Sequence, residues 1–275
     1  MKYVFLNLKR FDVPVSLGGV NRSDVFTWAS KIIFNTSKID RFKETKFAVF
    51  FPEAYLMQAI EAVRSCSSPM QIGCQSVFRM DVETGKNFGA FTTNRPAKAM
   101  KALGVEYTII GHCEERRDKL GMMNEADCRD KSAINRILNQ EIICAINSGL
   151  KVLYCIGETS EEQPAKFEVL REQLSVGLEG VDRSKVVIAY EPVWAIGPGK
   201  TPPDEPYIRE IAQFIKKECD NMPVVYGGGL KADNASMLAK IVEIDGGLIA
   251  LTRFSGEIGF YANEYLDIVS LYLGA

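Results

Sequence analysis

The chain of 275 residues is 47% hydrophobic and 25% charged, a composition that excludes a disordered or fibrous protein and supplies enough apolar material for a core. Its 33 basic residues nearly balance its 35 acidic residues, so it lacks the positive field that non-specific binding to nucleic acid or anionic membranes requires. No apolar run approaches the roughly 20 residues that span a bilayer, and the apolar segment 3–8 is too short for the core of a signal peptide. We therefore expect a cytoplasmic protein without nucleic-acid or membrane partners.

Short runs of β-branched and aromatic residues alternate with longer amphipathic segments, which predicts strands followed by helices around a parallel sheet. The expected strands are residues 3–7, 46–51, 70–75, 106–111, 151–155, 186–190, 223–226 and 247–251. The expected helices include residues 54–65, 95–103, 164–176, 206–219, 234–244 and 261–272. Eight such pairs favour an α/β protein with a single (β/α)8 TIM barrel domain over residues 1–275. A doubly wound open sheet would show the same alternation, so the choice depends on the motifs.

Polar residues directly after a strand are the first place to look for chemistry, because ligands meet the carboxyl ends of the strands in either topology. The first expected strand ends in Asn7 and is followed by Lys9, although a lysine after a strand is common on protein surfaces. The fourth is followed by His112, the only histidine, and a lone histidine is more often structural than catalytic. A nucleophilic pair of Cys113 and His112 is not expected, since neighbours at a strand end point to opposite sides.

The sixth expected strand leads directly into Glu191, and Pro192 holds that residue extended. A carboxylate is thereby presented at the end of the strand. The turn at residues 197–199 lies between Pro192 and Pro202, which favours a lid with stiff ends whose backbone approaches a ligand at Gly197. From these local residues alone, a solvated glutamate beside a surface turn is an equally good interpretation.

A cluster of glycines follows the seventh expected strand. Backbone N–H groups at Gly227, Gly228 and Gly229 are free to face an anion. The segment also satisfies a dinucleotide-binding pattern that ends at Ala232. That pattern needs an acidic residue about 20 positions on, at the end of the next strand, whereas Asp245 precedes that strand and only one strand remains. A phosphate-binding loop is therefore favoured over a dinucleotide site.

The seven cysteines are odd in number, form no Cys-x-x-Cys pair and mostly lie in apolar stretches. This pattern is typical of buried thiols in a reducing compartment. A chain with one histidine offers almost no ligands for a zinc site of the usual mixed His/Cys type. We expect no metal.

Taken together, these segments resemble the triosephosphate isomerase family. Residues 189–201 are similar to the family's catalytic-glutamate and lid signature, with Pro198 as an unusual residue at the lid tip. Residues 111–116 resemble its Gly-His-Ser-Glu-Arg-Arg motif, with Cys113 in place of serine. The matches run in the family's order over nearly the whole chain.

Three further segments extend the resemblance. Residues 7–9 resemble the family's Asn-x-Lys element, and residues 155–158 match a motif at the end of the fifth strand. Residues 226–229 resemble its Tyr-Gly-Gly-Ser phosphate loop, with Gly229 in place of the serine. The resemblance implies a TIM barrel that interconverts dihydroxyacetone phosphate and glyceraldehyde 3-phosphate as a homodimer, without a cofactor.

The resemblance also implies roles for individual residues. Glu191 is the general base and His112 the neutral electrophile that polarises the substrate carbonyl, a pairing for which triosephosphate isomerase itself is the standard example. Lys9 attracts the phosphate and stabilises enediolate charge, and Asn7 positions oxygen atoms. Phosphate binding falls to Gly197, Gly228, Gly229, Ala250 and Leu251, and supporting roles fall to Glu114, Cys155 and Gly157.

Several departures from the family lie near the expected pocket. The side chains of Ala250 and Leu251 reduce the room for close approach to a phosphate, and Arg253 either reinforces anion binding or is merely exposed. Two alternatives follow: isomerisation of a four-carbon ketose phosphate such as an erythrulose phosphate, and a barrel that binds a sugar phosphate without turning it over.

Two other departures concern the third loop. Residues 77–88 are longer than usual in the family, which favours an altered dimer contact. Asn94 and Glu115 replace a glutamate and an arginine and remove both halves of an expected ion pair, which is less damaging than losing one half.

Overall fold

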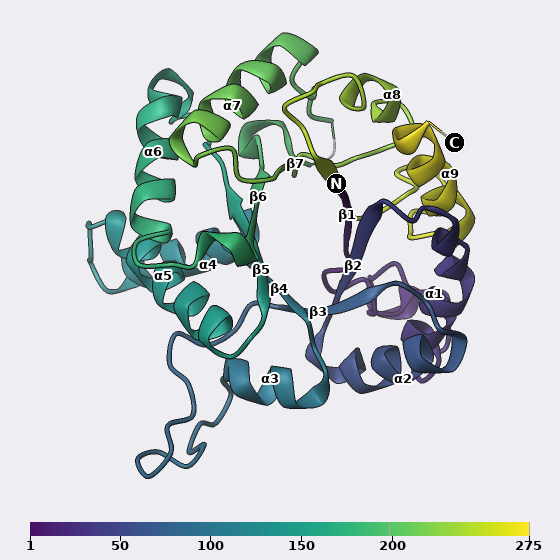
Figure 1. Ribbon diagram of the computed structural model, residues 1–275, viewed down its shortest axis with the longest axis horizontal. Helices are drawn as coiled ribbons and strands as arrows, with labels where there is room; N and C mark the ends of the chain where they lie inside the picture. The colour runs from purple at the N-terminus through teal and green to yellow at the C-terminus, as the bar shows by residue number, and fades with distance from the viewer. Residues whose placement is uncertain (198, 275) are drawn as a thin grey trace.

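The computed structural model describes residues 1–197 and 199–274, so Pro198 lies outside the described residues. Its strands pair in parallel and in chain order, and the last pairs with the first to close the barrel drawn in Figure 1. They are β1 (Lys2–Asn7), β2 (Thr45–Phe51), β3 (Gln71–Gln75), β4 (Tyr107–Ile110), β5 (Lys151–Ile156), β6 (Val186–Tyr190), β7 (Val224–Tyr226) and β8 (Gly246–Ile249). The closed sheet confirms the expected TIM barrel and excludes the open alternative.

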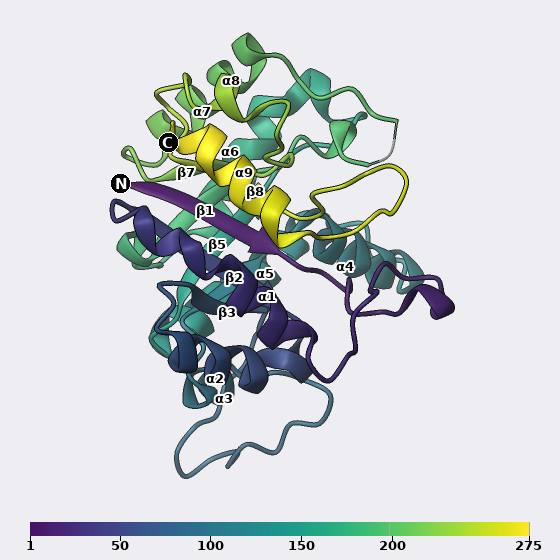
Figure 2. The ribbon, with the colours of Figure 1, turned by 90° about the vertical axis from the view of Figure 1, so that its right-hand side faces the viewer.

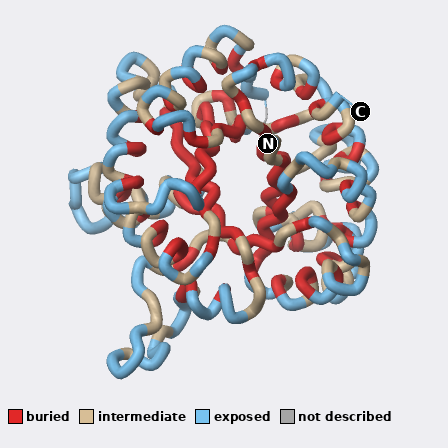
Figure 3. The backbone as a smooth tube through the Cα atoms, viewed as in Figure 1, coloured by how far each residue is buried: buried red, intermediate tan, exposed pale blue. Residues whose placement is uncertain are grey.

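Helices form the outer ring. They are α1 (Trp28–Thr36), α2 (Leu56–Cys66), α3 (Ala97–Leu103), α4 (Cys113–Glu125), α5 (Ser132–Asn147), α6 (Lys166–Gly177), α7 (Glu205–Glu218), α8 (Ala235–Leu238) and α9 (Ala262–Leu273). Within the described part of the chain, none is long and apolar enough to cross a membrane. Figure 3 shows the buried strands inside and the exposed outer faces of the helices.

Most expected boundaries lie within two residues of the observed ones, and two of the differences change the loops. The helix expected over residues 234–244 ends at Leu238, because the following residues form tight turns in which the Ile241 N–H bonds the Leu238 carbonyl at 3.2 Å. These turns bury Ile241 and Ile244 before β8 begins. The last strand ends at Ile249 rather than at residue 251, so the two residues after it belong to the loop at the barrel mouth.

The helix α7 illustrates how local sequence produces these elements. Asp204 caps it by accepting the N–H of Tyr207 at 3.0 Å. Pro206 lies in the first turn, where its missing N–H leaves no helical hydrogen bond unmade. Ile208 and Ile211 recur at helical spacing and are buried. Such apolar faces pack on the outside of the barrel, while rings such as Phe5 fill its interior.

The segment between β3 and α3 leaves the barrel as a long projecting loop (Figures 1 and 2). The rings of Phe78 and Phe91 pack edge to face in it, with centroids 5.5 Å apart. Phe88, in contrast, is 81% exposed. The loop therefore carries apolar surface into solvent.

A cluster of polar side chains is buried between this loop and helices α4 and α5. Lys119 Nζ lies 3.0 Å from Glu115 Oε1 and 2.9 Å from Glu141 Oε1. Ser76 Oγ donates to Glu115 Oε1 at 2.6 Å. Glu115 was expected to be one of two residues that remove a family ion pair, and here it pairs with Lys119, four residues on in α4. Asn94 is exposed and takes no part.

The stability of the fold is expected to depend on the proton of Glu141. Burial and the charge of Glu115 raise the pKa of Glu141 from 4.5 to about 8, with Lys119 opposing that rise. A carboxyl with a raised pKa binds its proton more tightly in the folded protein. The stabilisation that this protonated carboxyl gives to the folded protein is therefore complete below about pH 4.5 and is lost as the pH rises to about 8. We expect the free energy of unfolding to lose up to a few kcal/mol through this group across that window.

Urea unfolding at several pH values between 4.5 and 9 tests this linkage. In Glu141→Gln the loss is expected to be much smaller than in the wild type. Glu168→Gln, which changes an exposed residue of α6, is the matched control and should retain the wild-type slope. If the free energy of unfolding changed equally with pH in all three proteins, the raised pKa would not belong to Glu141.

Candidate active site

A cavity of about 1260 Å³ opens at the carboxyl ends of the strands, with walls from the loops after β1, β4, β5, β6, β7 and β8. Ten of the residues expected at the site line it: Asn7, Lys9, His112, Glu114, Gly157, Gly197, Gly228, Gly229, Ala250 and Leu251. Glu191 and Cys155 do not line it. Glu191 instead lies directly behind His112, and Cys155 lies in the interior of the barrel.

The end of β1 turns a lysine toward this cavity. Asn7 is 4% exposed, and its Oδ1 accepts the backbone N–H of Lys9 at 3.0 Å. Lys9 has a φ of 42°, a left-handed conformation that side chains with a Cβ rarely adopt, and Gln75 Nε2 holds its carbonyl at 2.8 Å. The Lys9 ammonium then lies 2.7 Å from Glu114 Oε1. The wall thus carries a cation whose present partner is a half-exposed carboxylate.

The histidine is held in one neutral form. His112 caps the N-terminus of α4, where its Nδ1 accepts the N–H of Glu114 at 3.2 Å. A ring nitrogen that accepts a hydrogen bond carries no proton, so the imidazole is neutral with its proton on Nε2. That Nε2 lies 3.3 Å from Glu191 Oε1. The geometry provides an N–H donor rather than an imidazolium.

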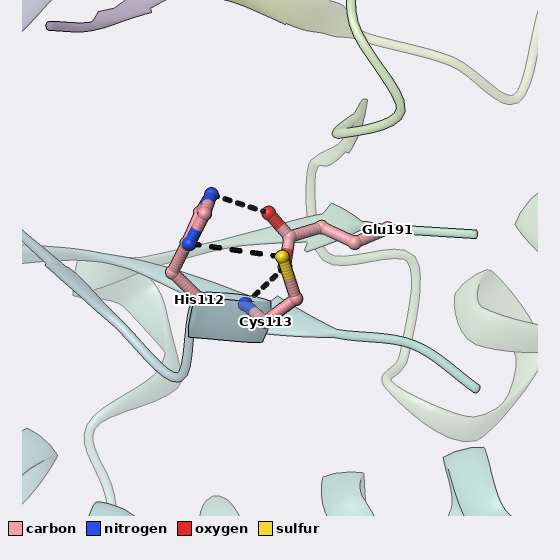
Figure 4. A group of neighbouring side chains, drawn as sticks. All are labelled: His112, Cys113 and Glu191. Atoms are coloured by element: carbon pink, nitrogen blue, oxygen red, sulfur yellow. Dashed lines mark hydrogen bonds and ion pairs between the residues drawn. The ribbon is translucent and has the colours of Figure 1, made fainter. Parts of the chain in front are cut away.

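The carboxylate of Glu191 is almost completely buried at the end of β6. Its Oε2 accepts the N–H of Cys113 at 2.8 Å, and its Oε1 faces His112 Nε2 at 3.3 Å without forming a regular hydrogen bond, a pair drawn dashed in Figure 4. Burial raises the pKa of Glu191, while His112, the Cys113 N–H and Lys9 offset part of that rise. An unsatisfied buried oxygen with a raised pKa is suited to accepting a proton.

Two glycines make room for the backbone and side chain of Glu191. A Cβ on Gly157 would lie 1.8 Å from the Glu191 carbonyl oxygen, so no other residue fits there. Gln173 binds both the N–H and the carbonyl of Gly157, each at 2.8 Å. A Cβ on Gly227 would lie 2.8 Å from Glu191 Cγ. In the sequence, Gly227 stands out only as part of a glycine cluster, and no local signal indicates Gln173.

The first turn of the expected lid is fixed by a buried carboxylate. Glu158 Oε1 accepts hydrogen bonds from Tyr190 Oη at 2.9 Å, Trp194 Nε1 at 2.8 Å and Tyr207 Oη at 2.9 Å. The sequence placed Glu158 in a supporting motif, but nothing near Tyr207 indicated that α7 contributes to the lid base. The arrangement holds Trp194, at the start of the expected lid segment, in place.

Arg116 was not singled out in the sequence, yet it ties β4 to β5. Its Nε donates to the Gly111 carbonyl at 2.8 Å and its Nη2 to the Cys155 carbonyl at 3.0 Å. The Cys155 side chain is fully buried, and burial raises the pKa of its thiol well above the usual value. Cys155 therefore contacts this network through its backbone.

The expectation that Cys113 points away from His112 is wrong. Cys113 Sγ lies 3.8 Å from His112 Nδ1, because β4 ends at Ile110 and Cys113 begins a helix, where strand alternation no longer applies. Burial, followed by the charge of Glu191, raises the pKa of Cys113 to about 12. The thiol is protonated at neutral pH and is not an activated nucleophile.

His112, Cys113 and Glu191 also bring three possible metal-ligating atoms within 4.8 Å of one another (Figure 4). The ring is committed elsewhere, however, because Nδ1 accepts the Glu114 N–H and Nε2 carries the proton. A metal ion would have to displace that proton or break that bond. The donor set therefore fits a proton-transfer pair better than a resident metal.

The open question about Arg253 is decided by its contacts. Its Nε donates to Glu264 Oε1 at 2.9 Å, and its guanidinium lies 3.9 Å from the centroid of the Tyr261 ring. It does not line the cavity, whereas Lys231 does. Arg253 therefore braces the final loop through Glu264 and Tyr261.

Comparison with known proteins gives a consistent picture. A family model described as triosephosphate isomerase matches residues 22–269. The triosephosphate isomerase of Syntrophotalea carbinolica is 36% identical over 197 residues, which cover 67% of this chain and 71% of that protein. That of Leptospira interrogans is 34% identical over 230 residues, covering 77% and 83%.

A crystal structure of triosephosphate isomerase from Bartonella henselae has the same fold, with a TM-score of 0.73 over 99% of both chains at 22% identity. The match of the family model over nearly the full length, together with relatives above 30% identity, is sufficient for an assignment. The chain belongs to the triosephosphate isomerase family.

Proposed function

We propose that residues 1–275 form one isomerase domain that interconverts dihydroxyacetone phosphate and glyceraldehyde 3-phosphate. The observation that carries the proposal is the 3.3 Å approach of Glu191 Oε1 to the neutral His112 Nε2, behind a wall that bears Lys9. A base, a hydrogen-bond donor and a cation are the three groups that enediolate chemistry needs. Family membership supports the same reaction.

In the proposed mechanism, the Glu191 carboxylate removes a proton from the carbon next to the substrate carbonyl. The electron pair of that C–H bond forms the carbon–carbon double bond of the enediolate, and the carbonyl oxygen becomes negative. His112 Nε2–H and the Lys9 ammonium stabilise this oxygen, and Asn7 positions it. His112 then donates its Nε2 proton to this oxygen and takes up the proton of the neighbouring hydroxyl. Glu191 returns the carbon-derived proton to the former carbonyl carbon, and the neighbouring oxygen becomes the new carbonyl.

The phosphate is proposed to bind backbone N–H groups at the cavity wall, namely those of Gly197, Gly228, Gly229, Ala250 and Leu251. Closure of the lid would exclude water and suppress elimination of the phosphate from the enediolate. No cofactor takes part in these steps.

One observation favours a second substrate. Ala250 and Leu251 line the cavity at the position where the resemblance places phosphate binding. Their side chains can shift the phosphate and leave space for a four-carbon ketose phosphate. Measuring kcat/KM on three- and four-carbon substrates distinguishes the two, and we expect the three-carbon pair to be preferred. A large preference for an erythrulose phosphate would replace the first proposal.

A solvent-exchange experiment tests a purely binding role. We expect the protein to exchange the carbon-bound proton of dihydroxyacetone phosphate with deuterium from the solvent. A protein that bound the substrate without this exchange would be a sugar-phosphate-binding barrel and not an isomerase.

We also propose that the protein works as a homodimer in the cytoplasm. The projecting loop, with Phe88 exposed, offers apolar surface for a second copy. The unpaired state of all seven cysteines suits a reducing compartment. Light scattering is expected to give twice the chain mass of 30.6 kDa, and Phe88→Asp is expected to shift the protein toward the monomer. A monomeric wild type would contradict this prediction.

A further inference from the structure

The buried polar cluster of Ser76, Glu115, Lys119 and Glu141 lies outside the cavity, and no step of the proposed mechanism uses it. Its charged side chains come from α4 and α5 and are only 16%, 14% and 6% exposed for Glu115, Lys119 and Glu141 respectively. Burying three ionisable groups is costly unless they compensate one another. The cluster therefore calls for an explanation beyond packing.

The cluster is connected to the catalytic histidine through one peptide unit. Glu115 Oε2 accepts the N–H of Gly111 at 2.6 Å, while Arg116 Nε holds the carbonyl of the same residue at 2.8 Å. Gly111 has a φ of 80°, and a Cβ there would lie 2.7 Å from the Cys155 carbonyl oxygen. The backbone immediately before His112 is thus held from both sides in a conformation that only glycine adopts easily.

The charges of the cluster balance only when one carboxyl is protonated. Burial opposes ionisation of Glu115, but Lys119 and hydrogen bonds from Ser76 and Gly111 outweigh it and lower the pKa of Glu115. Burial and the charge of Glu115 keep the proton on Glu141 at neutral pH by raising its pKa to about 8. Glu115 is therefore the ionised acceptor, and a charged acceptor binds the Gly111 N–H about twice as strongly as a neutral one.

We propose that Glu115, Lys119 and Glu141 form a positioning unit for His112, in which Lys119 holds the Glu115 side chain in place and Glu115 fixes the turn that presents the imidazole. This inference rests on the proposed function for its catalytic consequence. The orientation and tautomer of His112, which the unit is proposed to fix, can be measured without turnover.

The central test is Lys119→Met. Removing the ammonium leaves two buried carboxyl groups without a cation, so Glu115 is expected to take up a proton and to hold the Gly111 N–H more weakly. We expect kcat to fall roughly ten- to hundredfold while KM stays within about threefold, because misplacement of the electrophile affects the reaction more than substrate binding. Lys216→Met removes a similarly buried, ion-paired lysine from α7 and is the matched control, with kcat expected to stay near the wild-type value.

A second readout reports on His112 without substrate. Because the chain has one histidine, labelling histidine with ¹⁵N gives a spectrum of this imidazole alone. The wild type should show one neutral ring with the proton on Nε2. In Lys119→Met the signals are expected to split or broaden as the bond from the Glu114 N–H to Nδ1 weakens. Lys216→Met should retain the wild-type spectrum.

A compensated variant separates positioning from packing. In Lys119→Met/Glu115→Gln the cluster is neutral again, and the amide oxygen of the new glutamine can still accept the Gly111 N–H. We expect kcat of this double variant to be at least threefold higher than that of Lys119→Met. Its ¹⁵N spectrum is expected to show a single set of signals. A packing role predicts that the double variant is as impaired as the single variant or worse, and that result would overturn the proposal.

The two proposals fail in different ways. If the wild type did not isomerise triose phosphates but the His112 spectrum still responded to Lys119→Met and to its compensation, the function would be wrong and the positioning unit would stand. If the wild type turned over normally and Lys119→Met left both the spectrum and kcat unchanged, the positioning unit would be wrong.

Discussion

Glu191→Gln is expected to lower kcat by roughly 10³- to 10⁴-fold while changing KM only a few-fold. The amide has nearly the shape of the carboxylate and can still accept the Cys113 N–H, so the pocket is preserved. It has no appreciable basicity, so the proton on the substrate carbon has no acceptor. The steady-state kcat and the rate of solvent deuterium exchange are expected to fall together. Glu168→Gln on the outer face of α6 should leave both near the wild-type value.

The pH profile of the wild type provides a second check on Glu191. Burial raises the pKa of this carboxyl, and a base acts only when it is ionised. On lowering the pH, kcat/KM is therefore expected to decline at a higher pH than the ordinary carboxyl value of 4.5 would give. Near-normal turnover in Glu191→Gln would show that another group removes the proton.

Lys9→Met is expected to reduce kcat/KM by roughly 10²- to 10³-fold, through both kcat and KM. The Lys9 ammonium lies on the cavity wall 2.7 Å from Glu114. Its removal takes away the cation that attracts the phosphate and stabilises the enediolate oxygen. It also leaves Glu114 unpaired at the wall, where it repels an anionic substrate. Measurement of kcat and KM on dihydroxyacetone phosphate tests both effects.

The double variant Lys9→Met/Glu114→Gln separates the two contributions. Neutralising Glu114 removes the repulsion without restoring the cation. We expect KM to recover part of the loss while kcat stays low. If Lys9→Met alone changed kcat/KM by less than threefold, Lys9 would have no role in the reaction.

The local sequence predicted the alternation of strands and helices, and the motifs favoured a barrel over an open sheet. Strand alternation over eight short runs depends on which side chains face the core, and that pattern is written in neighbouring residues. The barrel is confirmed, and the predicted strand at residues 186–190 matches β6 to the residue. The strand ends also placed His112 and Lys9 at the carboxyl edge, where the cavity lies.

The errors share a physical cause. The predicted helix over residues 234–244 and the orientation of Cys113 were both read from local periodicity. In each case the chain leaves its regular element earlier than the pattern suggests. Where an element ends depends on caps and on what the next residues can bury, which a periodicity signal does not contain.

Partners of buried polar groups were decided by the tertiary structure alone. Glu115 and Glu141 share Lys119 although they lie on different helices, and Glu158 collects donors from β6, the lid and α7. A buried charge is stable only beside its partner, and distant segments become neighbours only when the barrel closes. The residue types thus determined the fold and the candidate chemistry, whereas the protonation states and the bracing of the site follow from which helices pack together.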